Sequence, residues 1–149
     1  MPVKARLLHD GEMRAFMLVL DKGDEVVTRL VAFARDNNLV AGFLTGIGAF
    51  SDVTFGFFEK ERRDYKRIVI NEQVEVISLK GNVALDGRGE PKLHAHVVVG
   101  KADGAAHGGH LLEAHVWPTL EVILFAPHEP LRRSVDDETG LPLINFSES

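Results

Sequence analysis

Hydrophobic and polar residues alternate along much of the chain, with the two-residue period of strands that bury one face. Turn residues separate these stretches, and the Asp-Gly pair at residues 10–11 lies between two of them as a hairpin signal. The pattern therefore predicts strands at residues 3–8, 14–20, 52–59, 65–70, 74–79, 93–100 and 119–125.

Residues 21–38 have a different period, because their apolar side chains recur every three or four positions. These side chains would form one stripe of a single amphipathic helix: Val26, Val27, Leu30, Val31 and Ala34. Asp24 and Glu25 suit its first turn, where the helix dipole favours acidic side chains, and the Asn-Asn pair at residues 37–38 suits its end. Many strands and one main amphipathic helix predict an α+β fold, in which the helix packs on a largely antiparallel sheet.

The segment between residues 41 and 59 is apolar but contains four glycines. Two of them, Gly46 and Gly48, lack the lysine and the following helix that a phosphate-binding loop requires. The glycines therefore indicate bulges or close backbone contacts within strands.

The composition narrows the classes of function. Of the 149 residues, 45% are hydrophobic and 26% are charged, as is typical of a soluble globular protein. The 17 basic and 22 acidic residues give a formal charge of -5, which does not favour non-specific binding to nucleic-acid phosphates. The absence of cysteine excludes disulfides, thiolate zinc sites and cysteine nucleophiles, so any metal would need histidine and carboxylate ligands.

The N-terminal residues lack the long apolar core of a signal peptide, and the apolar runs elsewhere are far too short to span a bilayer. A cytoplasmic location without membrane insertion is therefore the default expectation. Because no internal repeat or interdomain linker divides the sequence, we expect a single domain at this length.

Five of the seven histidines lie within residues 92–116. His94 and His96, two apart on a predicted strand, project from the same face and can converge on one ion. The glycine pair before His110 permits a close approach, so the chain returning after an Asp-Gly turn can bring His110 beside them. Three imidazoles predict a divalent-metal site, with zinc as the expected ion and one coordination position left open.

Other placements of the histidines are open. The His-x-His pair could belong to a solvated strand face or to a subunit interface. We expect His107 on an exposed turn before the glycines, whereas His115 could face either solvent or the core. The remaining two are expected to be structural or solvent-exposed: His9 and His128.

Two carboxylates follow the histidines, Glu113 and Glu121. Glu121 lies among apolar residues of the strand predicted at residues 119–125, where a charge needs a reason. It could orient a ligand histidine, act as a catalytic base or pair with a basic side chain; alternatively, it reaches water at a sheet edge. Glu121 is therefore the candidate catalytic residue.

Two segments carry a family resemblance: GFLTGIGAFSDV at residues 42–53 and HAHVVVGKADGAAHGGHL at residues 94–111. Together with the helical segment before them and the strand TLEVIL after them, they resemble the plant and prokaryote conserved (PPC) domain family. The resemblance covers roughly residues 12–126. Residues 1–149 would then form a single PPC-like domain, with a C-terminal tail at residues 127–149.

The resemblance implies an α+β domain that assembles as a homotrimer and holds a metal with its three family histidines, here His94, His96 and His110. Prokaryotic relatives are often labelled as candidate DNA-binding proteins, and plant relatives carry AT-hook motifs. An AT-hook needs an Arg-Gly-Arg core for the minor groove, whereas the nearest string here, Gly-Arg-Gly-Glu at residues 87–90, has one arginine.

Three functions follow as hypotheses. The first is a homotrimeric metal-binding and interaction module with a regulatory role. The second is DNA binding through residues 59–67, where five basic and three acidic side chains leave a charge of +2. The third is a metal-dependent enzyme or small-molecule-binding protein that uses the open metal position, although residues 97–101 lack the glutamate that a cupin-type dioxygenase would place there.

Overall fold

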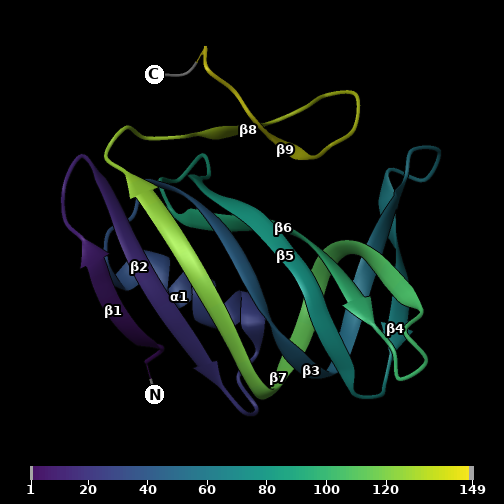
Figure 1. Ribbon diagram of the computed structural model, residues 1–149. Helices are drawn as coiled ribbons and strands as arrows, with labels where there is room; N and C mark the ends of the chain where they lie inside the picture. Colours follow the sequence, from purple (N-terminus) through teal and green to yellow (C-terminus); the bar gives the residue numbers. More distant parts are fainter. Residues whose placement is uncertain (1, 148–149) are drawn as a thin grey trace.

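Seven antiparallel strands form one twisted sheet, and a single helix covers one of its faces (Figure 1). The computed structural model describes residues 2–147 and confirms the expected α+β class. The elements are β1 (Lys4–His9), β2 (Met13–Asp21), α1 (Val26–Asp36), β3 (Ala41–Glu59), β4 (Asp64–Ile70), β5 (Val74–Leu85), β6 (Pro91–Gly100), β7 (Ala106–Pro127), β8 (Arg133–Val135) and β9 (Pro142–Ile144).

The strand order is β1-β2-β7-β6-β5-β3-β4, with a further pairing between β7 and β3. Because β7 pairs with both β6 and β3, and β5 links those two strands, these four strands close into a ring. Strands far apart in sequence are thereby held side by side around the segment that is rich in histidine.

Three strands are several residues longer than the sequence pattern predicts. One is β5, which continues to Leu85, whereas the pattern predicts its end at residue 79. β3 runs unbroken through the glycine-rich segment, with register shifts beside Gly48 and Phe50. β7 begins at Ala106, whereas the pattern placed the start of a strand after Pro118. Such shifts are bulges, which let a strand bend and accommodate a proline without ending.

The ends of helix α1 are set by side chains. Glu25 is the N-cap rather than a first-turn residue, because its carboxylate accepts hydrogen bonds from the backbone N–H groups of Val27 (3.2 Å) and Thr28 (2.9 Å). The same carboxylate accepts the N–H of Ala114 in β7 at 3.1 Å, which ties the helix to the sheet. Asn37 closes the other end, as expected, and its side-chain amide donates to the carbonyl of Phe33 at 2.9 Å.

The two faces of the sheet differ in what covers them. The inner face packs against α1 through a continuous apolar core that includes Leu20, Leu124 and, from the helix, Leu30. The opposite face leaves large apolar side chains exposed, among them Phe43 (49%), Ile47 (62%) and Ile77 (58%). We call these three residues the outer apolar patch.

The C-terminal segment is folded against the sheet. β8 and β9 form a hairpin across one end of the sheet (Figure 1). Leu131 anchors this segment, since its N–H donates to the carbonyl of Val40 at 3.0 Å and its own carbonyl accepts the N–H of Leu85 at 2.8 Å. Among residues 2–147, no helix is long and apolar enough to cross a membrane.

Candidate metal centre

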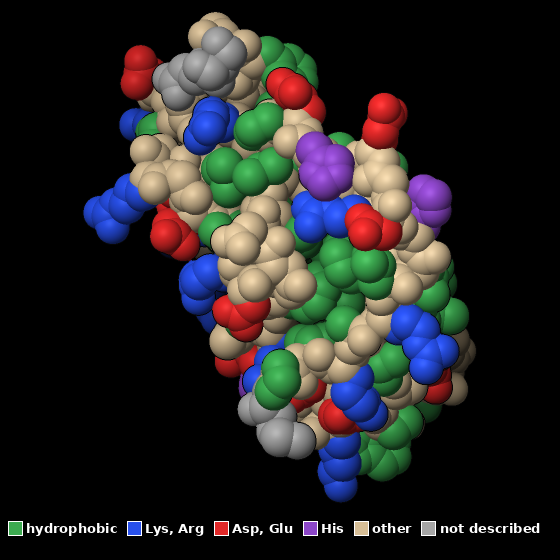
Figure 2. Space-filling model, turned by 90° about the vertical axis from the view of Figure 1, so that its left-hand side faces the viewer, with side chains coloured by type: hydrophobic (Ala, Val, Ile, Leu, Met, Phe, Trp, Pro, Cys, Tyr) green, Lys and Arg blue, Asp and Glu red, His purple; other side chains and the backbone are tan. Residues whose placement is uncertain are grey.

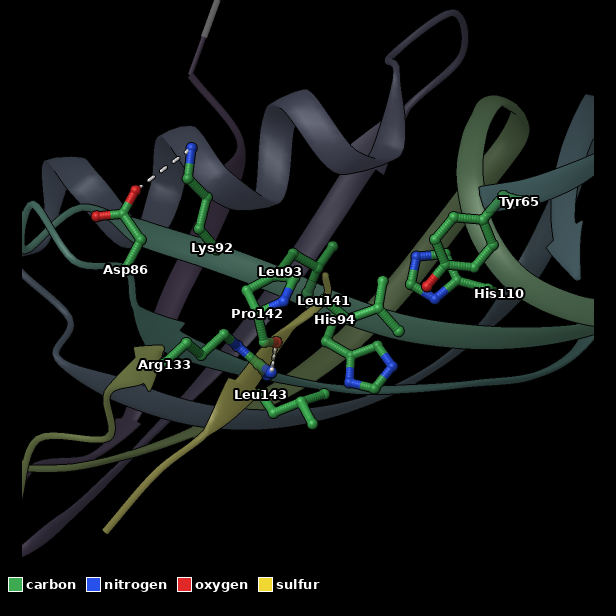
Figure 3. A pocket seen from close by; sticks show the side chains of 10 residues that line it. All are labelled: Tyr65, Asp86, Lys92, Leu93, His94, His110, Arg133, Leu141, Pro142 and Leu143. Atoms are coloured by element: carbon green, nitrogen blue, oxygen red, sulfur yellow. Dashed lines mark hydrogen bonds and ion pairs between the residues drawn. The ribbon is translucent and has the colours of Figure 1, made fainter. Parts of the chain in front are cut away.

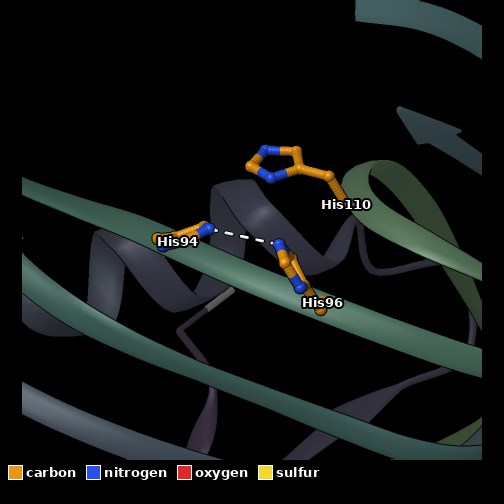
Figure 4. A group of neighbouring side chains, drawn as sticks. All are labelled: His94, His96 and His110. Carbon is orange, nitrogen blue, oxygen red and sulfur yellow. Dashed lines mark hydrogen bonds between the residues drawn. The ribbon is translucent and has the colours of Figure 1, made fainter. Parts of the chain in front are cut away.

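Strands β6 and β7 bring the three candidate ligands together (Figure 4). His94 and His96 project from one face of β6, and His110 of β7 lies directly opposite His96 in the antiparallel register. A ring nitrogen of each histidine lies within 4.8 Å of one from each of the others, and the Nε2 atoms of His94 and His96 are 3.2 Å apart. The expected convergence of these side chains is therefore present.

The glycine pair before His110 explains how β7 comes so close. A Cβ atom on Gly108 would lie 2.7 Å from the carbonyl oxygen of Val97, and one on Gly109 would lie 3.0 Å from that of Gly56. Both contacts are tighter than ordinary van der Waals packing allows. Only glycine lets this part of β7 fit between β6 and β3, so the pair positions the imidazole that follows it.

The donor set fits a divalent transition metal. Tetrahedral zinc with nitrogen ligands at 2.0–2.1 Å would hold those nitrogens roughly 3.3 Å apart. The separation of 3.2 Å between the Nε2 atoms of His94 and His96 matches that value, and a ring nitrogen of His110 lies within 4.8 Å of both of these histidines. Imidazole suits zinc, copper, iron and nickel, so the residues define a metal class rather than one ion.

The surroundings favour the neutral form of His94 and His110. Burial, followed by the charges of His94 and His96, lowers the pKa of His110 to about 4. The pKa of His94 is lowered as well, first by burial and then by the charges of His96 and Arg133. Because a metal binds the deprotonated imidazole nitrogen, this environment favours coordination at neutral pH.

A cavity of about 470 Å³ opens beside the histidines (Figure 3). His94 and His110 line one part of it, and the ring of Tyr65 stacks on His110 with a centroid distance of 4.6 Å. Burial raises the pKa of the Tyr65 phenol. The C-terminal hairpin contributes another wall, which includes Arg133 and Leu143.

Two of these cavity residues, Tyr65 and Arg133, had not been singled out from the sequence. Tyr65 follows the basic loop, and its aromatic character in an alternating strand carries no site signal. Arg133 lies on a strand of three residues, which is too short to show a period. Only the spatial arrangement connects them to the histidines.

The other histidines lie elsewhere. His107 is exposed, as expected, but it belongs to β7 opposite Val99 rather than to a turn, because the strand begins one residue before it. It points away from the face that carries His110, three positions on. His9 is exposed on β1, and His128 lies against the carbonyl of Gly11 at 3.1 Å.

His115 has a carboxylate environment. Its Nδ1 atom lies 2.9 Å from the carboxylate of Asp52 on β3. The hydrogen bond to Asp52 raises the pKa of His115, and the charges of Asp52, Glu113 and Glu25 add to that effect. Acidic neighbours stabilise the protonated form of this histidine, so its surroundings differ from those of the three clustered imidazoles.

The structure places Glu121 away from the three histidines. It lies on β7 opposite Ile47 of β3, whereas His110 lies opposite Gly56, further along the same strand. Glu121 belongs neither to the three-histidine group nor to the lining of the cavity. Its side chain is on the outer face beside the outer apolar patch, which explains a charge among apolar neighbours. Glu113 is exposed opposite Thr54.

The chain is similar to known proteins in both sequence and structure. The family model of the Plants and Prokaryotes Conserved (PCC, also written PPC) domain matches residues 8–126. A curated relative, bifunctional protein GlmU of a Synechococcus strain, is 32% identical over 136 residues, which are 89% of this chain and 20% of that protein. The chain thus spans about a fifth of the curated relatives it matches.

Three solved structures are similar over almost the whole chain. A PPC protein of Pyrococcus horikoshii is 33% identical with a TM-score of 0.84, covering 89% of this chain and 91% of its own. A metal-containing protein of Archaeoglobus fulgidus is 30% identical with a TM-score of 0.82, covering 97% and 99%. A candidate DNA-binding protein of Bacteroides thetaiotaomicron is 27% identical with a TM-score of 0.90, covering 98% and 99%.

Proposed function

Because the chain belongs to the Plants and Prokaryotes Conserved domain family, we propose that it is a metal-binding module in which His94, His96 and His110 hold one zinc ion. The observation that carries the proposal is the convergence of three imidazoles, two of them with Nε2 atoms 3.2 Å apart. The metal-containing relative of 30% identity supports it. Three protein ligands leave a coordination position for a further ligand.

Each residue of the centre has a defined part in this function. His94 and His96 approach the ion from β6, and His110 approaches it from β7. The stacked Tyr65 ring restrains the orientation of His110 and shields it from water. A bound zinc ion would supply a Lewis acid that attracts an oxygen ligand into the adjoining cavity.

Metal analysis tests this function. The chain, purified without a nickel column, is expected to contain one zinc ion per polypeptide, and removal of the ion by a chelator should lower the melting temperature until zinc is restored. Elemental analysis and thermal denaturation provide the two readouts. Protein without stoichiometric metal, whose melting temperature does not respond to zinc, would refute the proposal.

We further propose that the chain assembles as a homotrimer through the outer apolar patch. Soluble monomers rarely expose contiguous apolar patches of large side chains, and Phe43, Ile47 and Ile77 lie on adjacent strands of one face. The stacking of Phe43 on Phe125, at a centroid distance of 5.2 Å, extends this surface onto β7. A second copy of the chain is the occupant that the family resemblance implies.

Ile47→Asp tests the assembly, because a carboxylate in an apolar interface costs several kcal/mol when it has no partner. Sedimentation equilibrium is expected to give a trimer for the native chain and a monomer for the variant. The matched control is Val69→Asp, at an equally exposed apolar position (65%) on the edge strand β4. A monomeric native protein at micromolar concentration would rule the trimer out.

DNA binding is the second candidate function, because a relative of 27% identity is described as a candidate DNA-binding protein. Its best local support is the basic loop at residues 59–67, but Arg62 there pairs with Glu59 at 3.1 Å and Arg63 donates to the carbonyl of Asp137 at 3.0 Å. Figure 2 shows basic and acidic side chains interleaved on the face that it displays. Phosphate contacts strengthen at low salt, so a lack of binding to duplex DNA at low salt would exclude this function.

The metal-dependent enzyme remains the alternative use of the open position. Its candidate base, Glu121, lies beside the outer apolar patch rather than at the cavity. We therefore favour a binding function for the cavity over catalysis. Turnover that survives His96→Ala would argue against any reaction at the metal.

A further inference from the structure

We propose that the cavity beside the three histidines binds a small organic carboxylate, whose anionic group is held by Arg133 and whose second oxygen donor faces the metal site. The proposed contact between the carboxylate and Arg133 does not depend on a bound metal. The contact at the histidines rests on the proposed metal-binding function, so the two parts are tested separately.

Arg133 is a buried cation without an acidic partner. Its side chain is 6% exposed and lines the cavity. The guanidinium donates to the carbonyl of Pro142 at 3.0 Å and to the side-chain oxygen of Asn82, which are both neutral acceptors. No carboxylate of the described chain lies within 4.0 Å of it. Because buried charges are normally compensated, an anion in the cavity is the missing partner.

The neighbouring carboxylate in the cavity wall is already engaged. Asp86 accepts the backbone N–H groups of Arg88 (2.8 Å) and Glu90 (3.0 Å) and lies 3.9 Å from the ammonium of Lys92. These contacts hold the turn between β5 and β6 and keep the charge of Asp86 away from Arg133 (Figure 3). An arriving anion would meet Arg133 without competition from that side chain.

The sheet register places Arg133 next to the metal ligands. Its hydrogen-bond partner Asn82 lies on β5 directly opposite His94 of β6. Side chains at such opposed positions are about 4.5–5.5 Å apart at Cβ. Arg133 is thus one cross-strand step from His94, and a short ligand can span the distance between the guanidinium and the histidines.

The remaining walls indicate a carbon skeleton between these two polar ends. Leu93, Leu141, Pro142 and Leu143 line the cavity together with the ring of Tyr65. A cavity of about 470 Å³ is within the range of small-molecule sites. Apolar walls with a single buried guanidinium fit a carboxylate with a short hydrocarbon body better than inorganic phosphate, which would need more donors around it.

Isothermal titration calorimetry with succinate tests the site, with succinamide as the neutral isostere and inorganic phosphate as the competing anion. We expect succinate to bind the zinc-loaded chain and, more weakly, the metal-free chain. Succinamide should bind at least tenfold more weakly than succinate, and phosphate should bind more weakly than succinate as well. Equal affinity for succinamide, or tighter binding of phosphate, would overturn the carboxylate assignment.

Arg133→Met should weaken succinate binding at least tenfold in both metal states and leave the zinc content unchanged. Arg132→Met is the matched control, because Arg132 precedes Arg133 but does not line the cavity. Unchanged succinate affinity in Arg133→Met would refute the proposal. If the native chain contains no stoichiometric zinc, the proposed metal function is refuted. Succinate binding to the metal-free chain that depends on Arg133 would still support the carboxylate site.

Leu143→Glu provides a second variant that does not remove a buried group. Leu143 lines the cavity and is 44% exposed, so the substitution is compatible with folding. Its new carboxylate would compete for Arg133 and should reduce succinate affinity at least tenfold. Retention of native affinity in this folded variant would count against Arg133 as the anion-binding group.

Discussion

His110 and His115 lie five positions apart on β7, and their pKa values are shifted in opposite directions. His110 faces two other imidazoles and a tyrosine ring, and it is held neutral. His115 faces the carboxylate of Asp52 and is stabilised as a cation. The same side chain on the same strand is therefore a metal-ligand candidate in one place and an ion-pair partner in the other.

The difference is caused by the strands on either side. β6 presents His96 opposite His110, whereas β3 presents Asp52 opposite His115. The number of histidines in a sequence segment thus says little about which of them lie together in the folded protein. The cross-strand register, which only the folded sheet defines, makes that choice.

The largest expected effect is on metal binding. His110→Ala should weaken zinc binding at least about 100-fold, because one of three ligands is lost, whereas His115→Ala should leave it within about twofold. Competition with a chromogenic chelator measures both affinities. A similar loss in the two variants would show that the histidines of β7 are not divided as the structure indicates.

Acid should destabilise the metal-free protein through His110. Its folded pKa of about 4 lies below the unfolded value of about 6.5, so the unfolded chain binds more protons between these values. The contribution of neutral His110 to the free energy of unfolding is therefore fully present above pH 6.5. The free energy of unfolding should fall by roughly 1–3 kcal/mol as the pH drops toward 4.

Urea denaturation of the chelator-treated protein at pH 7.5 and pH 5 measures this change. His110→Gln, which has no titrating group at that position, should show a smaller difference between the two pH values. An equal acid-induced loss in the variant would mean that other groups cause it.

The carboxylate surroundings of His115 can be altered through Glu25. Glu25→Ala should destabilise the protein by about 1–2 kcal/mol, because it removes the helix N-cap and the acceptor for the N–H of Ala114. Chemical denaturation measures the change. Glu113→Ala, at an exposed position of β7, is the control and should change stability by less than about 0.5 kcal/mol.

The smallest effect concerns the ion pair itself. Asp52→Asn should lower the pKa of His115, because it removes the strongest cause of the raised value. The ion pair between His115 and Asp52 should stabilise the folded protein by less than about 1 kcal/mol, since the His115 side chain is 37% exposed. This stabilisation is present below the unfolded pKa and is lost as the pH rises through the folded pKa.

Titration of the His115 ring proton by NMR, in the native chain and in Asp52→Asn, measures the shift directly. The ring proton of His107, which lies away from this pair, is the internal reference. An unchanged pKa for His115 in the variant would contradict the assigned pairing.

Much of the fold was predictable because its signals are local. Alternating residues gave most strands, and the three-to-four-residue period gave helix α1 with its Asn37 end. The convergence of His94 and His96 also follows from local geometry, since residues two apart share a strand face. The placement of His110 could be predicted because the two glycines before it allow the returning chain to lie close to the strand that carries His94 and His96.

The rest depends on contacts between distant segments. The lengths of β3, β5 and β7 were underestimated because bulges shift the alternation within each strand. Glu121 was the candidate base on chemical grounds, but its position opposite Ile47 is a property of the register. Arg133 reaches the cavity only because a hairpin anchored by Leu131 folds back over the sheet.

The close packing at Gly108 and Gly109 has a consequence for how this protein tolerates mutation. A single added methyl group at either position would collide with a backbone carbonyl of the neighbouring strand, at 2.7 Å or 3.0 Å. Saturation mutagenesis scored by metal retention should therefore find deleterious substitutions at two residues that have no side chain and cannot coordinate anything. Substitutions at this centre are therefore limited by the lack of room for a side chain at Gly108 and Gly109, as well as by the need for metal ligands.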